Sequence, residues 1–282
     1  MSNSSDSKKV KALALDLDGT ILAPGAVLSE RTIRAVSGCI QRGIKIFIAT
    51  GRAPEAVEPF RVSLGAEGPM IFFNGALVVE MPGNEILSTT LLDKKVVETG
   101  LDISREMGVY YQVYFSGTNE DRRIALMADK NFPERDMYHK NTGMLAELGD
   151  LKEVLGHPGL SGCIKAMFLA EPEVLESVRL RLDMRLGKSV YIVKSQPNYL
   201  EILNRRVSKG RGLKLAMRHC SLKKEEVIAF GDEENDLPMF AAAGFSAAPS
   251  NAKESVKEAA DLVISSNAED GVAAYLEELF GL

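Results

Sequence analysis

Residues Ala14-Leu15-Asp16-Leu17-Asp18-Gly19-Thr20 join an apolar run to an acidic turn. The apolar run, residues 10–15, is short and is broken at Gly19, which predicts a buried β-strand followed by a turn. Asp16 and Asp18 are two residues apart, so in an extended chain their side chains point to the same face. At the end of the strand, Gly19-Thr20 can turn the chain and redirect Asp18. Two neighbouring carboxylates attract a hard cation. A plain Asp-rich turn is the alternative that this stretch alone leaves open.

Two further short apolar runs precede residue 76, and each also ends in polar residues. They are residues 44–49, before Thr50-Gly51-Arg52, and residues 70–73, before Asn74-Gly75. The segments between the three runs have the apolar spacing of helices. Strands that alternate with helices in this way are typical of a doubly wound parallel sheet, which gives an α/β fold.

The carboxyl ends of parallel strands meet at one edge of the sheet, where ligands bind. Asp16, Asp18, Thr50 and Asn74 are therefore predicted to share that edge. A later apolar run, residues 227–230, ends in a second acidic sequence, Gly231-Asp232-Glu233-Glu234-Asn235-Asp236.

Four aspartates would converge at this edge, namely Asp16, Asp18, Asp232 and Asp236. Such a group repels itself unless protons or a cation reduce its charge, and an all-oxygen site suits Mg²⁺. Lys209 stands at the start of a predicted helix, where a positive side chain and backbone N–H groups favour a phosphate.

The middle of the chain has a different pattern, in which short strand candidates outnumber helices. We interpret residues 83–196 as an α+β insert between two parts of the α/β core, residues 1–82 and 197–282. Tyr110, Tyr111 and Tyr114 lie in one of its strand candidates. Packing within the sheet is favoured for these tyrosines over the lining of a substrate pocket.

The composition excludes several classes of protein. The chain has 282 residues and a net charge of −5, so it lacks the basic surface of a nucleic-acid-binding protein. No apolar run approaches the roughly 20 residues that span a bilayer, and residues 1–9 lack the apolar segment of a signal peptide. The cysteines Cys39, Cys163 and Cys220 are too far apart to suggest a disulfide framework. A cytoplasmic protein is therefore expected.

These residue types suit phosphoryl transfer. An aspartate can attack phosphorus and form an aspartyl-phosphate, while a second carboxylate protonates the leaving alkoxide and later deprotonates water. A bound metal ion reduces the repulsion between nucleophile and phosphate. Asp16 and Asp18 fit these two roles, and the chemistry alone leaves open which residue takes which role.

Four ordered motifs resemble those of the haloacid dehalogenase superfamily, and more narrowly those of its Cof-type phosphatases. They are Asp16-Leu17-Asp18-Gly19-Thr20, Ala49-Thr50-Gly51-Arg52, Ser208-Lys209-Gly210 and Phe230-Gly231-Asp232-Glu233-Glu234-Asn235-Asp236. Each motif stands in the expected strand or helix context. The resemblance implies a Rossmann-like core with a cap domain, and the insert lies where that family carries its cap.

The resemblance also implies roles for single residues, by position in the motifs. Asp16 would be the nucleophile and a Mg²⁺ ligand, and Asp18 the acid/base, with its backbone carbonyl on the metal. Asp232 would be the third metal ligand from the protein. The phosphate would be bound by Leu17, Thr50, Gly51, Lys209 and Asn235. Asp236, Arg52 and Asn74 would have supporting positions.

The leading hypothesis is a Mg²⁺-dependent phosphatase that acts on a small-molecule phosphate ester, without nucleic acid or membrane partners. The alternatives are a sugar phosphomutase and a catalytically silent protein that binds a phosphate ligand. The substrate remains open among sugar phosphates, pyridoxal phosphate, nucleotides and flavin phosphates. A monomer and a homodimer are both compatible with the sequence.

Overall fold

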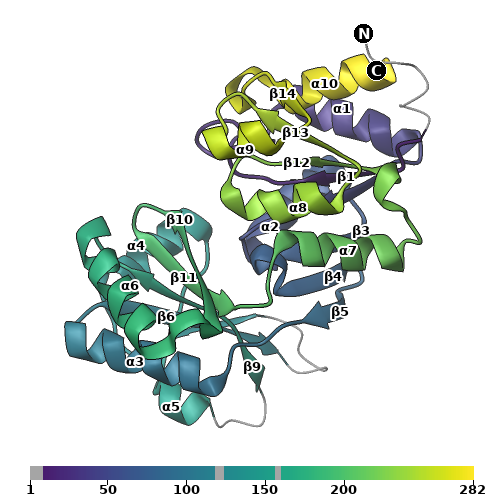
Figure 1. Cartoon of the computed structure of the whole chain (residues 1–282). Coiled ribbons are helices and arrows are strands. Elements are labelled where there is room, and N and C mark those ends of the chain that lie inside the picture. The colour runs from purple at the N-terminus through teal and green to yellow at the C-terminus, as the bar shows by residue number, and fades with distance from the viewer. Residues whose placement is uncertain (1–8, 118–123, 156–159) are drawn as a thin grey trace. The chain divides into compact units, whose positions relative to one another are not determined.

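The structure is a computed structural model that describes residues 9–117, 124–155 and 160–282. Residues 1–8, most of the polar stretch at the start of the sequence, lie outside the described residues. The chain divides into two compact units, which Figure 1 shows. The first comprises residues 1–52, 57–88 and 208–282, and the second comprises residues 53–56 and 89–207. The insert predicted from the sequence, residues 83–196, overlaps the second unit and differs from it at both ends.

A five-stranded parallel sheet forms the centre of the first unit, with the strand order β14-β13-β12-β1-β2. Its strands are β1 (Ala12–Leu15), β2 (Lys45–Ile48), β12 (Val227–Phe230), β13 (Phe245–Pro249) and β14 (Leu262–Ile264). Each strand is parallel to its neighbours. The predicted α/β fold with a doubly wound parallel sheet is confirmed.

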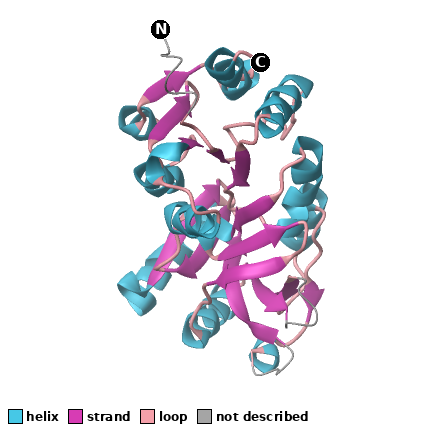
Figure 2. Cartoon of the chain, turned by 90° about the vertical axis from the view of Figure 1, so that its right-hand side faces the viewer, coloured by secondary structure: helices cyan, strands magenta, loops and turns pink. Residues whose placement is uncertain are grey.

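The helices of this unit are α1 (Glu30–Gln41), α2 (Pro54–Leu64), α7 (Lys209–His219), α8 (Leu237–Ala242), α9 (Glu254–Ala259) and α10 (Gly271–Phe280). Two of them, α1 and α7, begin directly after a serine whose side chain caps the helix. The Ser29 hydroxyl caps α1 by accepting the Thr32 N–H at 3.0 Å, and Pro54 is the first residue of α2. Figure 2 distinguishes these helices from the strands that they flank. Across the part of the chain that the structure describes, no helix is long and apolar enough to cross a membrane.

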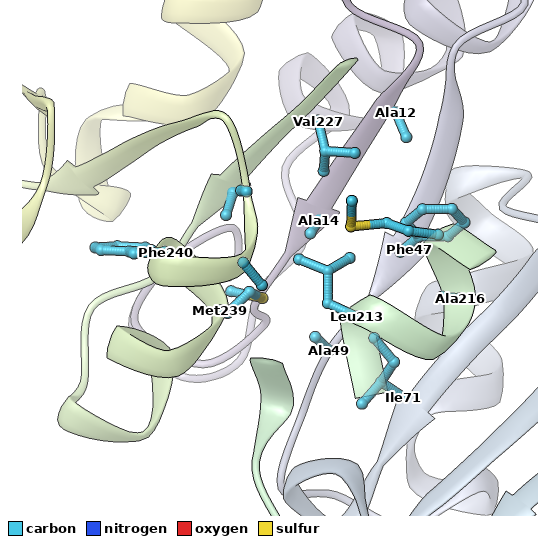
Figure 3. Close-up of a cluster of buried hydrophobic side chains, with 14 of the residues drawn as sticks. Ala12, Ala14, Phe47, Ala49, Ile71, Leu213, Ala216, Val227, Met239 and Phe240 are labelled. Atoms are coloured by element: carbon cyan, nitrogen blue, oxygen red, sulfur yellow. The ribbon is translucent and has the colours of Figure 1, made fainter. Parts of the chain in front are cut away.

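Strand β1 is buried on both faces. Because side chains alternate along a strand, its residues pack into two different layers. Ala12 and Ala14 lie in a buried cluster with Leu213 of α7 and Met239 of α8 (Figure 3). Leu13 and Leu15, which point to the opposite face, have no exposed surface. On that face Phe230 of β12 meets the ring of Tyr275 of α10 edge-on, with centroids 5.9 Å apart. The small alanines let α7 and α8 approach the sheet closely.

The third predicted strand lies beside the chain that follows β2 and also belongs to a second sheet. We expected residues 70–73 to continue the parallel sheet, and β3 (Gly68–Phe72) forms a parallel bridge there, between Ile71 and Ala49, with the Thr50 N–H donating to the Ile71 carbonyl at 2.9 Å. In addition, β3 forms an antiparallel sheet with β4 (Leu77–Met81) and β5 (Glu85–Thr89), of which β4 was not predicted. The turn η1 (Phe73–Gly75), whose three residues all have positive φ, reverses the chain between β3 and β4.

A six-stranded sheet with the order β10-β11-β9-β6-β7-β8 forms the second unit. Its strands are β6 (Tyr110–Gly117), β7 (Ala125–Ala128), β8 (Glu147–Leu148), β9 (Leu160–Leu169), β10 (Val190–Gln196) and β11 (Tyr199–Asn204). Its helices are α3 (Lys94–Met107), α4 (Pro133–Thr142), α5 (Leu151–Val154) and α6 (Pro172–Leu186). The α+β character predicted for the insert matches this unit, although α4 was not predicted.

The tyrosines of β6 pack within this sheet, as the sequence favoured. Tyr110, Tyr111 and Tyr114 are at most 2% exposed. Tyr111 points into an apolar cluster with α3 and α6 and stacks at a tilt on Phe168, with ring centroids 4.6 Å apart. The Tyr114 side chain points to the opposite face of the sheet. Its hydroxyl makes a short hydrogen bond with the hydroxyl of Tyr138 of α4.

A buried ion pair lies on the same face as Tyr114. Lys165 Nζ is 3.0 Å from Glu201 Oε1, and the two side chains are only 3% and 5% exposed. The Lys165 ammonium also lies over the Tyr114 ring, 4.7 Å from its centroid. A charge removed from water this completely depends on its partner, because burial of an unpaired charge is very unfavourable.

We predict that Lys165→Met lowers the free energy of unfolding of the second unit by about 3–5 kcal/mol, because it leaves the Glu201 carboxylate buried without a cation. Urea unfolding followed by tyrosine fluorescence measures this, since the chain has no tryptophan and six of its seven tyrosines lie in residues 89–207.

Arg179→Met is the matched control, because Arg179 pairs with Asp183 at 4.0 Å with both side chains 54% exposed. That exposed pair contributes about 0–1 kcal/mol. If Lys165→Met and Arg179→Met lowered the free energy of unfolding by the same amount, the prediction would be wrong.

Candidate active site

The parallel register brings three loops to one edge of the sheet. Leu15 is paired with Ile48 of β2 and with Phe230 of β12. Asp16, Thr50 and Asp232 follow these three strand ends within two residues. The Asp16 N–H donates to the Phe230 carbonyl at 3.0 Å, which fixes the start of the first loop. The edge predicted from the sequence therefore exists, and its polar residues come from three strands.

Lys209, the first residue of α7, joins two aspartates at this edge. Its Nζ lies 2.6 Å from Asp16 Oδ1 and 2.7 Å from Asp236 Oδ1. The Lys209 side chain is only 2% exposed. Ser208 caps α7 by accepting the Arg211 N–H at 3.2 Å, so the helix begins at the lysine. A Cβ on Gly75, which has φ +95°, would lie 2.3 Å from the Ser208 carbonyl oxygen, so the η1 turn packs directly against this helix start.

The Thr20 hydroxyl connects the first and last of these loops. It lies 3.1 Å from Asp16 Oδ2 and 3.0 Å from Asp232 Oδ1. A hydroxyl has one proton, so it can donate to only one of the two carboxylate oxygens at a time. The approach is close because Gly19, with φ +78°, has no side chain: a Cβ there would lie 2.1 Å from Asp232 Oδ2. Thr20 belongs to the first motif but was not predicted as a site residue.

The electrostatics of the cluster follow from its burial. Burial raises the pKa of Asp16 well above its usual range; Lys209 opposes this, and Asp236 and Asp232 add to it. Burial and the charge of Asp236 raise the pKa of Asp232 to about 6. For Lys209, burial alone would lower the pKa, but the charges of Asp16 and Asp236 raise it above its usual value. The site thus has one firmly charged lysine and more carboxylates than that lysine can neutralise.

A divalent cation fits this arrangement. Oxygens of Asp16, Asp232 and Asp236 lie within 4.8 Å of one another. Asp236 is the most fully engaged, because its Oδ2 accepts the N–H groups of Asp232 and Glu233 at 3.0 and 3.1 Å while its Oδ1 accepts from Lys209. Among the described residues, the Thr20 hydroxyl is the one donor to Asp16 Oδ2 and Asp232 Oδ1, and Asp232 Oδ2 accepts no hydrogen bond. These three oxygens therefore have too few donors, and a hard cation would supply the missing positive charge.

The loops after β2 and β12 are linked by two amides. Asn235 Nδ2 donates to Asn74 Oδ1 at 2.9 Å, and the Asn74 N–H donates to the Thr50 carbonyl at 2.9 Å. Asn74 is buried in the left-handed conformation, with φ 57°. Asn235 Oδ1 is buried and has no hydrogen-bond partner among the described residues. Thr50, Asn74 and Asn235 are thus brought together, as the sequence predicted for this edge.

Asp18 lies apart from the carboxylate cluster. Its two oxygens accept from Arg52, with 2.8 Å between Arg52 Nε and Asp18 Oδ2 and 2.5 Å between Nη2 and Oδ1. Leu17, between Asp16 and Asp18, is buried, and its carbonyl accepts the N–H groups of Thr20, Ile21 and Leu22. This turn directs Asp18 away from Asp16, as the Gly19-Thr20 sequence allowed.

Two asparagines near the C-terminus hold the first loop and were not predicted as site residues. Asn251 Nδ2 donates to the Gly19 carbonyl at 2.8 Å, and Asn267 Nδ2 donates to the Leu22 carbonyl at 2.7 Å. Asn251 Oδ1 in turn accepts the Asn267 N–H at 2.9 Å. Asn251-Ala252 resembles the pattern of the Cof-type phosphatases, so the sequence carried a signal for Asn251, whereas only the contacts identify Asn267.

A buried lysine among carboxylates, at the carboxyl edge of a doubly wound sheet, defines the class of site found in enzymes that transfer or hydrolyse phosphoryl groups. The comparisons with known proteins agree with this class. The chain matches the family model of the haloacid dehalogenase-like hydrolases over residues 13–276. The chain therefore belongs to the haloacid dehalogenase-like hydrolase family.

Individual relatives match over nearly the whole chain. A Haemophilus influenzae protein whose name marks it provisionally as a phosphatase is 33% identical over 279 residues, which cover 96% of this chain and 97% of that protein. The 5-amino-6-(5-phospho-D-ribitylamino)uracil phosphatase YitU of Bacillus subtilis is 30% identical over 283 residues, with 96% and 97% covered.

A solved haloacid dehalogenase-like hydrolase from Bacteroides thetaiotaomicron has a TM-score of 0.85 and 25% identity, and the match covers 96% of this chain and all of that one. Together these findings confirm the predicted enzyme class, a phosphatase of the haloacid dehalogenase superfamily.

We predict that Asp232→Asn stabilises the metal-free protein at pH 8 by about 1–3 kcal/mol. A pKa of about 6 means that folded Asp232 binds its proton more tightly than the unfolded side chain, whose usual pKa is 3.8. The contribution of Asp232 to the free energy of unfolding of the wild type is therefore higher at low pH. It falls as the pH rises from the usual pKa of 3.8 to about 6, where folded Asp232 loses its proton.

Urea unfolding in EDTA at pH 8 and pH 5 measures the difference between the variant and the wild type. The advantage of Asp232→Asn should shrink at the lower pH, where the wild-type carboxyl group is largely protonated. A variant that is less stable than the wild type at both pH values would contradict the assigned charge balance.

Proposed function

We propose that this phosphatase is Mg²⁺-dependent and hydrolyses a small phosphorylated metabolite through an aspartyl-phosphate at Asp16. The observation that carries the proposal is the Lys209 ammonium, held 2.6 Å from one oxygen of a buried aspartate that ends a parallel strand. A nucleophilic carboxylate must remain ionised, and a buried one needs such a cation beside it.

In the proposed first step, an Asp16 oxygen attacks phosphorus and the bond from phosphorus to the leaving oxygen breaks. Asp18 gives its proton to that oxygen. In the second step, Asp18 takes a proton from water, the water oxygen attacks phosphorus, and the bond to Asp16 breaks. Phosphate leaves, and Asp16 and Asp18 return to their starting protonation states.

The remaining residues at this edge would bind the transferred group. The Thr50 hydroxyl, the Lys209 ammonium, the Asn235 amide and the backbone N–H groups of Leu17 and Gly51 are donors suited to phosphoryl oxygens. Asp16, Asp232 and the backbone carbonyl of Asp18 would hold Mg²⁺, which when bound reduces the repulsion between the nucleophile and the phosphate. Asp236 would orient Lys209 and the loop that precedes Asp236, since its side chain accepts hydrogen bonds from the Lys209 ammonium and from the N–H groups of Asp232 and Glu233.

We further propose that the second unit acts as a cap that shields the reaction from water and selects the leaving group. Its main segment, residues 89–207, is inserted between Thr50 and Lys209 in the chain. Sugar phosphates and related phosphorylated polyols are the proposed substrates, and 5-amino-6-(5-phospho-D-ribitylamino)uracil, which names one relative, is included among them. A cytoplasmic location is part of the proposal and rests on the three cysteines, which form no disulfide.

The test is phosphate release from a panel of phosphorylated sugars, polyols, nucleotides and cofactors, measured with Mg²⁺ and with EDTA. We expect release that requires Mg²⁺ and that falls at least about 1,000-fold in Asp16→Asn, because the nucleophile is lost. Asp183→Asn, which changes a half-exposed aspartate of α6, is the matched control and should keep full activity. Release that is independent of Mg²⁺, or an active Asp16→Asn, would refute the proposal.

A further inference from the structure

The ion pair between Arg52 and Asp18 has the geometry of an anion-binding contact. The guanidinium Nε and Nη2 each donate to one of the two Asp18 carboxylate oxygens, at 2.8 and 2.5 Å. The Arg52 side chain is 27% exposed and that of Asp18 is 55% exposed. The arginine is therefore the more enclosed partner, and the carboxylate is the one that can exchange with groups from solution.

Arg52 is fixed in place by its own surroundings. Its N–H donates to the Thr50 hydroxyl at 3.1 Å, and its carbonyl accepts the Phe73 N–H at 3.1 Å. Its guanidinium lies over the Phe60 ring, 5.2 Å from the centroid. These contacts hold the guanidinium next to the loop that carries Thr50, which is one of the proposed phosphate ligands.

Asp18, in contrast, is in an arrangement that does not suit proton transfer. Its oxygens are not among the carboxylate oxygens that gather within 4.8 Å of one another. Because the bidentate contact holds both oxygens against the guanidinium, Asp18 must leave Arg52 before either oxygen can approach a leaving oxygen near Asp16. The observed pair is therefore a resting arrangement of Asp18.

We infer that Arg52 is a receptor for the phosphoryl group of the substrate and that Asp18 occupies this receptor until the substrate binds. An arginine fork binds carboxylates and phosphates with the same bidentate geometry, so either anion can take the position. The arriving phosphoryl group repels the Asp18 carboxylate and replaces it on the guanidinium. The exchange keeps Arg52 paired and frees the Asp18 carboxylate, which takes up a proton from solution and then approaches the leaving oxygen as the acid.

This inference rests on the proposed function, since it uses the role of Asp18 as acid/base. It differs from a surface ion pair, which would only stabilise the fold. It also makes Arg52 a positioning residue for Asp18, in addition to a ligand of the phosphoryl group.

The test is a double-mutant cycle on the binding of inorganic phosphate, measured by titration calorimetry in Mg²⁺ near neutral pH. Its members are the wild type, Asp18→Asn, Arg52→Gln and the double variant. A neutral amide competes weakly for the guanidinium, so we expect Asp18→Asn to bind phosphate at least about 5-fold more tightly than the wild type. In the Arg52→Gln background the same substitution should change the affinity less than about 2-fold.

Two results would overturn the inference. The first is a phosphate affinity of Asp18→Asn that is no higher than that of the wild type. The second is an equal gain in both backgrounds, which would mean that the amide only removes repulsion between Asp18 and phosphate. The matched controls are Arg31→Gln and Glu277→Gln, which change a similar bidentate pair between α1 and α10. They should leave the phosphate affinity at the wild-type value.

The cycle also separates this inference from the proposed function. If neither the wild type nor any variant binds phosphate in Mg²⁺, the proposed phosphate site is wrong and the inference is wrong with it. If phosphate binds, and turnover depends on Asp16 and Mg²⁺, but Asp18 and Arg52 show no coupling, the function stands and only the inference is overturned.

Discussion

The ammonium group of Lys209, shared by Asp16 and Asp236, is the interaction on which the rest of the site depends. Without it, three carboxylates would lie within 4.8 Å of one another in a buried place with no positive charge among them. The lysine is placed by the start of α7, and α7 is held against the sheet by the apolar cluster around Leu213. The packing of one helix thus determines whether the carboxylates can exist there in ionised form.

The site nevertheless retains an excess of negative charge, and this excess links stability to function. One threonine hydroxyl serves two carboxylates, and burial raises the pKa of both Asp16 and Asp232. Such an arrangement is unfavourable for the isolated protein, but it prepares oxygens for a cation. The sheet can support it because β1 is buried on both faces, which makes its carboxyl end a rigid base for the first loop.

The second unit also contains a buried lysine that is paired with an acidic side chain. It has its own apolar cluster, formed by α3, α6 and one face of its sheet, and its opposite face contains the buried pair of Lys165 and Glu201. A separate core is what allows the inserted segment to be a compact unit of its own. In both units a buried lysine is tolerated only because an acidic partner lies within about 3 Å.

The sequence by itself determined the parallel sheet, the capped helices and the edge where Asp16, Thr50, Lys209 and Asp232 meet, because these depend on local apolar periodicity and on residues next to strand ends. Only the tertiary structure decided which side chains of the site form hydrogen bonds with one another. Lys209 meets Asp16 across 193 positions of the chain. Thr20 serves Asp232 across 212, and no local pattern reports such contacts. The turn at Asn74 returned the chain as β4, antiparallel to β3, and the turn after Leu17 directed Asp18 to Arg52, because backbone conformation at single residues overrides the average spacing.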